Sequence, residues 1–389
     1  MTTELHNPLH NAEGCLWGVL IGDARGLPVE CKSPAEIRQQ FGYVDRYVRN
    51  RNHKWKSVAQ RASGTISDDS QLTLALMDSL TRKKGYDLQD IKLAHIEAWQ
   101  GKWGRPLGWG GSTRKSVKSY EKGQVFKPPA DSAGNGPPMK IAPLAIYSAL
   151  YYEKSAVGKF TNSFNAQLLK RCQEISGLTH GDPRCAVAAY CQARMIIRGI
   201  QGELSSLHSL KIAKLFIDDA IYAESQIDTI WDVQNVNWSG IDRPIDLLLP
   251  KKDGLNRLSE RMCEVFCGQF GDRDFYTGGC RYTRRGYGFA LDTRFVSTEI
   301  ATSQSSFIMN SYPLVAYCVA KYLPFRNFLY TINETVNAGA DADSNTAMTG
   351  AIAGAIFGAA AIPKSTISGL VCKKMAIKQI SEFLSSCSP

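Results

Sequence analysis

The 389 residues are 44% hydrophobic and 21% charged, which is typical of folded globular proteins and excludes a disordered or fibrous chain. The formal net charge of +10 would attract a phosphate-bearing partner, although solubility is the simpler explanation because the positive residues form no dominant block. The longest run of small and apolar residues, 350–362, is too short to span a bilayer, and the first residues lack the regions of a signal peptide. Since the eleven cysteines show no paired spacing, we expect reduced thiols and a cytoplasmic protein.

Hydrophobic residues recur at helical spacing through most of the chain, and strand patterns are sparse. The closely spaced glycines and the proline of residues 22–30 predict a break at the end of the first helix. Glycine-rich interruptions are predicted again at 104–111 and 132–138. In chain order, the predicted helices are 12–22, 72–80, 141–152, 164–176, 184–199, 207–225, 255–268, 314–322, 326–337 and a last one that begins after Asp343.

No internal repeat and no linker divides the sequence, so we predict one compact all-α domain over residues 12–386, after an N-terminal tail at 1–11. Within it, variable loops are predicted near 42–66, where the chain is basic, and near 269–290, where Gly, Tyr and Arg are frequent. Glycines also recur at every fourth position of the last predicted helix. Such spacing permits very close helix packing at Gly350, Gly354 and Gly358.

The first acidic motif is Ser67-Asp68-Asp69-Ser70, directly before a predicted helix. Residues of these types often act as an N-cap, because they accept hydrogen bonds from the free N–H groups of the first turn. One carboxylate would be enough for capping, and two adjacent ones repel each other unless a cation or hydrogen-bond donors compensate. Taken alone, the motif favours a helix cap over a metal site.

A second acidic motif, within residues 337–346, also lies at the start of a predicted helix. Asp341 and Asp343 alternate with a small residue and Ser344 follows, and oxygen donors of this kind are what Mg²⁺ selects. An EF-hand loop does not fit, because the terminal glutamate and the required spacing are missing. Two acidic helix starts far apart in the sequence predict a shared binuclear site, in which two ions hold and polarise substrate oxygens.

Glycine-rich segments are candidates for binding a diphosphate. Residues 108–113 and 132–136 can each present backbone N–H groups to phosphate oxygens, although most glycine clusters are turns. His180 lies in residues 179–183, between two predicted helices, where a histidine is usually a hydrogen-bonded loop residue.

Taken together and in order, these segments resemble the ADP-ribosylglycohydrolase family, which includes dinitrogenase-reductase-activating glycohydrolase and the ADP-ribosylarginine and ADP-ribosylserine hydrolases. Each motif alone is unspecific, whereas the ordered set, spread from Gly14 to Gly358, is specific. The resemblance is carried by GDARGLPVE at 22–30, SDDS at 67–70, GNGPPMKIAPL at 134–144, THGDP at 179–183 and NAGADADSNTAMTGAIAGAIFG at 337–358.

The resemblance implies an enzyme that removes ADP-ribose from a protein or another acceptor by cleaving its N- or O-glycosidic bond. It also implies two Mg²⁺ ions, with Mn²⁺ as a substitute, that bind the ribose hydroxyls nearest the scissile bond. Glu30 matches the catalytic carboxylate of the family. The implied metal ligands are Ser67, Asp68, Asp69, Asp341, Asp343 and Ser344. The residues implied to line the substrate are Gly110, Gly111, Ser132, Gly134, Asn135, Gly136, His180 and, at the adenine end, Tyr287.

Lys140 and Ala340 are among the positions that depart from the family pattern. Lys140 replaces the usual arginine, so a compact ammonium group stands where a guanidinium could donate two parallel hydrogen bonds. Ala340 stands where a second glycine is common, which predicts a tighter loop.

Two alternatives stay open. A catalytically inactive ADP-ribose-binding protein of the same fold would be expected to lose an acidic ligand, and none is lost. A nucleic-acid-associated protein would use the basic loop, where Tyr47 and Trp55 can stack on bases. A basic face can also serve the enzyme if its substrate is ADP-ribosylated nucleic acid, so the acceptor stays open among arginine, serine, nucleic acid and a metabolite. The positive residues of this loop are Arg46, Arg49, Arg51, Lys54, Lys56 and Arg61.

Overall fold

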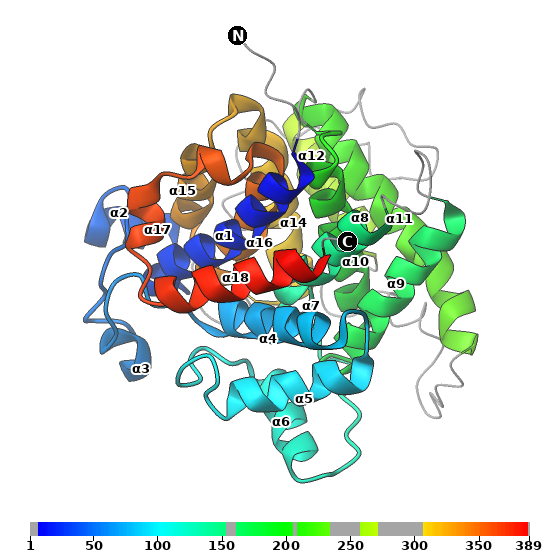
Figure 1. Cartoon of the computed structure of the whole chain (residues 1–389). Helices are drawn as coiled ribbons and strands as arrows, with labels where there is room; N and C mark the ends of the chain where they lie inside the picture. Colours follow the sequence, from blue (N-terminus) through cyan, green and yellow to red (C-terminus); the bar gives the residue numbers. More distant parts are fainter. Residues whose placement is uncertain (1–6, 153–160, 205–207, 234–256, 271–305, 388–389) are drawn as a thin grey trace.

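The computed structural model describes residues 7–152, 161–204, 208–233, 257–270 and 306–387 (Figure 1). Within these ranges the predicted all-α class is confirmed, because the structure has helices, no strand and two isolated bridges. Tyr287 and nearly all of the loop predicted near 269–290 lie outside the described residues. None of the helices found in these ranges is both long enough and apolar enough to cross a membrane.

Two helices near the centre of Figure 1, α1 (Pro8–Gly26) and α16 (Ala342–Phe357), pack against each other through glycine. A Cβ on Gly18 would lie 1.9 Å from the carbonyl oxygen of Gly350, and one on Gly14 would lie 2.5 Å from that of Gly354. Cβ atoms do not come so close to backbone, so the contact requires glycine at these positions. The close packing predicted for the glycines at 350 and 354 is confirmed, and α1 is the partner.

The predicted break within residues 22–30 was partly wrong, because α1 stays helical to Gly26 before the short 3-10 turn η1 (Leu27–Val29). A Cβ on Gly22 or on Gly26 would lie 2.2 Å from a carbonyl oxygen of α16. In the sequence, a glycine used for close helix packing looks the same as one that ends a helix. The helix also begins earlier than predicted, at Pro8, where Asn7 caps it by accepting a hydrogen bond from the Leu9 N–H (3.1 Å).

Each of the other predicted helices is present, although some ends differ by several residues, as for 207–225 against α11 (Ser209–Val233). The helix that begins near Asp343 is not the last, because two further helices follow it. The remaining elements are α2 (Pro34–Phe41), α3 (Lys56–Ala59), α4 (Asp68–Lys83), α5 (Leu88–Trp99), α6 (Gly111–Glu121), α7 (Gly136–Lys140), α8 (Ala142–Tyr152), α9 (Asn162–Gly177), α10 (Pro183–Ile200), α11 (Ser209–Val233), α12 (Leu258–Phe270), α14 (Ile308–Tyr322), η4 (Leu323–Phe325), α15 (Phe328–Ala338), η5 (Ala359–Ala361), α17 (Lys364–Ser368) and α18 (Lys373–Cys387).

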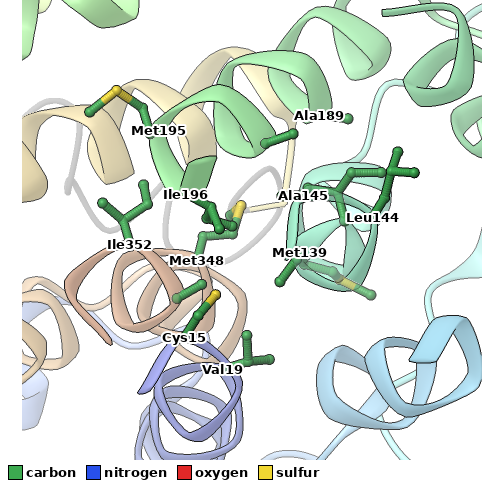
Figure 2. Packing of buried hydrophobic residues seen from close by; sticks show 14 of the residues in the cluster. Cys15, Val19, Met139, Leu144, Ala145, Ala189, Met195, Ile196, Met348 and Ile352 are labelled. Atoms are coloured by element: carbon green, nitrogen blue, oxygen red, sulfur yellow. The ribbon is translucent and has the colours of Figure 1, made fainter. Parts of the chain in front are cut away.

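Apolar side chains from α1, α7, α8, α10 and α16 form a core beside the glycine contact. Figure 2 shows Cys15 and Val19 of α1 next to Met348 of α16, with Ile196 of α10 above them. All four are buried, and burying one large apolar side chain contributes about 1.5–3 kcal/mol. This core therefore fixes the relative positions of the helices whose ends carry the acidic motifs.

Candidate active site

The start of α4 presents Asp68 and Asp69, and its cap comes from a different helix. Asp23 of α1 accepts hydrogen bonds from the backbone N–H groups of Ser67 (2.9 Å) and Ser70 (3.1 Å) and from the Ser70 hydroxyl (2.5 Å). The Ser67 side chain makes no cap and donates instead to Asp69 (3.0 Å). Because Asp23 satisfies these N–H groups, Asp68 and Asp69 are not needed to cap the helix.

The start of α16 supplies the opposite side of the same region. Asp341 is the N-cap residue, yet its side chain makes no cap bond and accepts a hydrogen bond from the Asn135 amide (2.5 Å). The Ser344 hydroxyl donates to Asp69 (3.2 Å), which joins residues 275 positions apart in the sequence. The side chains of Asp341 and Asp343 are both buried. The structure thus brings the two acidic motifs together, as the sequence predicted.

Six buried acids converge here, and we call them the acidic cluster: Asp23, Glu30, Asp68, Asp69, Asp341 and Asp343. Carboxylate oxygens of Asp23, Asp69 and Asp343 lie within 4.8 Å of one another, as do those of Glu30, Asp341 and Asp343. Among the described residues, one buried oxygen each of Glu30, Asp69 and Asp343 has no hydrogen-bond partner. A buried polar atom without a partner is costly, so this set of carboxylate and hydroxyl oxygens fits hard divalent cations.

Burial is the first cause of the raised pKa values in the cluster. It raises the pKa of Asp68 to about 8 and that of Asp23 to about 6. Burial, followed by repulsion from Asp343 and Asp341, raises the pKa of Glu30 well above its usual value. Within the described ranges no lysine or arginine forms an ion pair with these acids. A bound cation would stabilise the charged carboxylates and lower these pKa values.

Glu30 is held next to the α16 motif by a pair of backbone hydrogen bonds. The Cys31 N–H donates to the Ala340 carbonyl (2.7 Å), and the Ala340 N–H donates to the Lys32 carbonyl (2.9 Å). Cys31 and Ala340 are both left-handed, with φ of 61° and 60°. This conformation costs a non-glycine residue roughly 1–2 kcal/mol.

A cavity of about 620 Å³ opens over the acidic cluster, within the range of small-molecule sites. On one wall, a Cβ on Gly134 or Gly136 would lie 2.9 or 2.6 Å from the His180 ring, so the backbone before α7 rests on this imidazole. Burial lowers the pKa of His180 to about 3, so the ring is neutral at physiological pH. The predicted site residues that line the cavity are Glu30, Asp68, Gly110, Gly111, Gly134, Asn135, Gly136, His180, Asp341, Asp343 and Ser344.

Three described residues of the predicted site do not line this cavity. Ser67 and Asp69 are buried and belong to the network around the acidic cluster. Ser132 lies behind the cavity wall, where its hydroxyl donates a hydrogen bond to the hydroxyl of Ser112 (2.7 Å). Ser112 itself lines the cavity.

Sequence reasoning did not identify Asp23 as a site residue. The one signal available was an acid inside an apolar, glycine-rich helix, where a buried charge requires partners. The surroundings of Lys140 were also not predicted. Its ammonium group is fully buried and donates to the Thr179 hydroxyl (3.3 Å), which lies 2.9 Å from Nδ1 of His180. Burial lowers the pKa of Lys140 to about 7.

Comparison with known proteins shows which family this chain matches and which proteins are similar to it. Residues 4–386 match the model of a family described as ADP-ribosylglycohydrolase. The chain is 31% identical over 137 residues to ADP-ribosyl-[dinitrogen reductase] glycohydrolase of Rhodospirillum rubrum, an alignment that covers 35% of this chain and 44% of that protein. It is 24% identical over 374 residues to ADP-ribosylhydrolase ARH3 of Homo sapiens, covering 92% of this chain and 88% of the relative.

The fold also matches a solved structure. A structure described as an ADP-ribosylglycohydrolase-related protein complex superposes with a TM-score of 0.60 at 19% identity, and the match covers 98% of this chain and all of the other. At this identity the likeness extends to the fold alone.

Proposed function

The chain belongs to the ADP-ribosylglycohydrolase family and is therefore a glycosidic-bond hydrolase, and we propose that it removes ADP-ribose from a modified acceptor with the help of two Mg²⁺ ions. The observation that carries the proposal is the meeting of two acidic helix starts under one cavity. All the acids expected of an active member are present, so an inactive binding protein of this fold is not favoured.

The proposed metal ligands are the acids and hydroxyls at the two helix starts. Unpartnered oxygens of Asp69 and Asp343 support this assignment, since a cation would satisfy both. We assign Asp23 a supporting role as the cap of α4, beside the ligands. When bound, the two ions would supply the positive charge that holds and polarises the ribose hydroxyls next to the scissile bond. Mn²⁺, which takes the same oxygen ligands, is the expected substitute. The proposed ligands are Ser67, Asp68, Asp69, Asp341, Asp343 and Ser344.

Glu30 is proposed to transfer the proton. Its Oε2 atom has no protein partner, so it is free to exchange a proton with the substrate or with water. In the hydrolysis, the bond between C1 of the ribose and the acceptor atom breaks, and its electron pair leaves with the acceptor. The acceptor takes up a proton, and the hydroxide part of water bonds to C1. Glu30 can hold that proton or pass it to the leaving atom.

The glycine loops are proposed to hold the diphosphate and the second ribose. No atom lies within 4 Å of a Cβ built on Gly110 or Gly111, so the start of α6 has room for phosphate oxygens beside its free N–H groups. The neutral His180 supports the backbone at 134–136 without adding charge. Buried Lys140 lies one hydroxyl away from His180 behind this wall, through Thr179.

The proposal is tested by measuring ADP-ribose release from arginine-, serine- and nucleic-acid-linked substrates, with Mg²⁺ and with EDTA. We expect Mg²⁺-dependent release from at least one linkage and partial activity with Mn²⁺. Release that is equal in EDTA would overturn the metal assignment. Binding of ADP-ribose without release from any substrate would instead favour the inactive alternative.

A further inference from the structure

One wall of the cavity is a loop, residues 100–110, that connects α5 to α6 without a helix or strand. Its backbone is left-handed at Gly104 (φ 97°) and at Gly108 (φ 82°), a conformation that other residues rarely adopt. Such a loop has many accessible conformations in isolation, so contacts with the rest of the molecule must hold it in place. The loop residues that line the cavity are Pro106, Leu107, Gly108, Trp109 and Gly110.

A single side chain of α4, Gln71, holds this loop at three points. Its Nε2 donates hydrogen bonds to the carbonyl oxygens of Arg105 (3.0 Å) and Trp103 (3.5 Å). Its Oε1 accepts a hydrogen bond from the indole N–H of Trp109 (2.7 Å). The buried amide therefore uses its nitrogen and its oxygen on the loop, on both sides of the left-handed Gly108.

The chemistry of Gln71 fits the loop better than it fits a hydrophobic core. Burying an amide is costly unless it is hydrogen-bonded, and a methionine of similar shape would pack there without this requirement. A carboxamide can donate to a carbonyl and accept from an indole N–H at the same time, whereas a carboxylate or an ammonium group can do only one of the two. Packing alone therefore does not account for Gln71, and the position of the loop does.

The same helix carries Asp68, three residues before Gln71, and the loop also contacts this carboxylate. A Cβ on Gly108 would lie 2.6 Å from Oδ1 of Asp68, so the loop backbone rests on a proposed metal ligand. The Gly110 N–H donates to the same carboxylate. Residues three apart on a helix share one face, so α4 places a metal ligand and the loop by one rigid element.

We propose, on the basis of the hydrolytic function above, that Gln71 is a positioning residue that fixes the distance between the metal ligands and the phosphate-binding start of α6. ADP-ribose is then held at two points, by its terminal ribose at the ions and by its diphosphate at the start of α6. Gly111 leaves room for the diphosphate there, and Arg114 of the same turn also lines the cavity. A ligand held at two points binds tightly only when their spacing is fixed. Gln71 itself does not line the cavity, so it acts through the loop.

The test measures binding of ADP-ribose at saturating Mg²⁺ by isothermal titration calorimetry. Gln71→Met keeps the shape of the side chain and removes its three hydrogen bonds, so it should weaken ADP-ribose binding about tenfold. In turnover, the same variant should raise KM more than it lowers kcat, because Glu30 is not affected. Backbone hydrogen exchange of residues 103–110 should become faster. If Gln71 served stability alone, the melting temperature would fall while KM and the affinity for ADP-ribose stayed at the wild-type values.

A second variant removes the other partner of one of these hydrogen bonds. Trp109→Phe lacks the indole N–H and should weaken ADP-ribose binding several-fold, as roughly one hydrogen bond is lost. The double variant should bind no more weakly than Gln71→Met, because both substitutions act through the same contact. Trp103→Phe is the matched control in the same loop, since its indole N–H has no partner among the described residues, and its affinity should stay within about twofold of wild type. Gln89→Met, at an exposed position of α5, should bind as wild type.

The outcomes separate the two proposals. Wild-type affinity and KM in Gln71→Met, or fully additive losses in the double variant, would overturn the positioning role while leaving the hydrolase intact. If Gln71→Met does not fold, equal affinities of Trp109→Phe and Trp103→Phe would overturn it instead. No binding of ADP-ribose by the wild type and no release from any substrate would overturn the hydrolytic proposal itself.

Discussion

The two acidic helix starts look alike in the sequence, but they are constructed differently. At α4, Asp23 from α1 caps the N–H groups of Ser67 and Ser70, so Asp68 and Asp69 are not needed for these bonds. At α16, Asp341 stands at the cap position without capping, and the Asn135 amide holds its carboxylate in place. One start is thus supported by an acid from another helix, and the other by a neutral amide.

An acidic helix start is therefore an ambiguous signal in a sequence. Capping needs an acceptor near the free N–H groups, but the acceptor can belong to any nearby element. At α4 the cap is distant in the sequence, so the local acids can point into the site. The free energy that a local cap would contribute is supplied by Asp23, and the local carboxylates are available for a cation.

The largest effect is expected from Asp343→Asn, because Asp343 belongs to both groups of converging carboxylates. Turnover should fall by about 10³-fold or more, since a metal contributes several kcal/mol and each 1.36 kcal/mol is tenfold. In EDTA the variant should be at least as stable as wild type, because a buried negative charge is removed. Mg²⁺ should then raise the melting temperature of wild type but not of the variant.

Differential scanning fluorimetry with and without Mg²⁺ measures this change in the melting temperature of Asp343→Asn and of wild type. Asp218→Asn, at an exposed position of α11, is the matched control and should behave as wild type. A normal Mg²⁺ shift in Asp343→Asn would show that the ions bind elsewhere.

Glu30→Gln should slow kcat by roughly 10²–10³-fold, because proton transfer is lost while the shape of the side chain is kept. Glu30 lies next to the α16 start and is not one of the proposed metal ligands, so the Mg²⁺-dependent thermal shift should stay close to that of wild type. Single-turnover kinetics at saturating Mg²⁺ measure the chemical step without a contribution from metal binding. A rate equal to that of wild type would show that another group transfers the proton.

Asp23→Asn tests the support of α4 directly. The amide keeps one acceptor oxygen but loses the charge that favours the helix N-terminus, so α4 should hold its acids less firmly. We expect Mg²⁺ affinity to fall about 10–100-fold, as for partners that orient metal ligands, with kcat near normal at saturating Mg²⁺. Isothermal titration calorimetry gives the affinity. If saturating Mg²⁺ does not restore kcat, Asp23 acts as a ligand and the contrast between the two helix starts is smaller.

The smallest effect on turnover, with a clear effect on stability, is expected from Gly18→Ala. The new Cβ would lie 1.9 Å from the Gly350 carbonyl oxygen and force α1 away from α16, which costs about 1–3 kcal/mol of unfolding free energy. Urea denaturation measures this. Gly177→Ala, at a helical position of α9 with nothing within 4 Å of the added Cβ, should be neutral or slightly stabilising. Equal midpoints for the two variants would mean that the helix contact adapts.

Much of the chemistry could be predicted from the sequence, because it depends on local patterns. Hydrophobic periodicity indicates the helical class, and the two acidic motifs stand where helices begin. The positions of Glu30, His180 and the glycine loops came from the ordered family motifs, and the structure brings them to one cavity. Their roles as ligands, as the proton-transferring acid and as substrate contacts stay predictions.

Other features depend on contacts between segments that are far apart in the sequence. A glycine in a sequence can end a helix or let two helices touch, and only the partner helix shows that Gly22 and Gly26 do the second. Likewise, Asp23 has no local sign that it caps a helix 44 residues away. Hydrophobic periodicity and motif order are patterns of residues that are near one another in the sequence. Capping, close helix contact and the walls of the cavity depend instead on distances between segments that meet only when the helices pack.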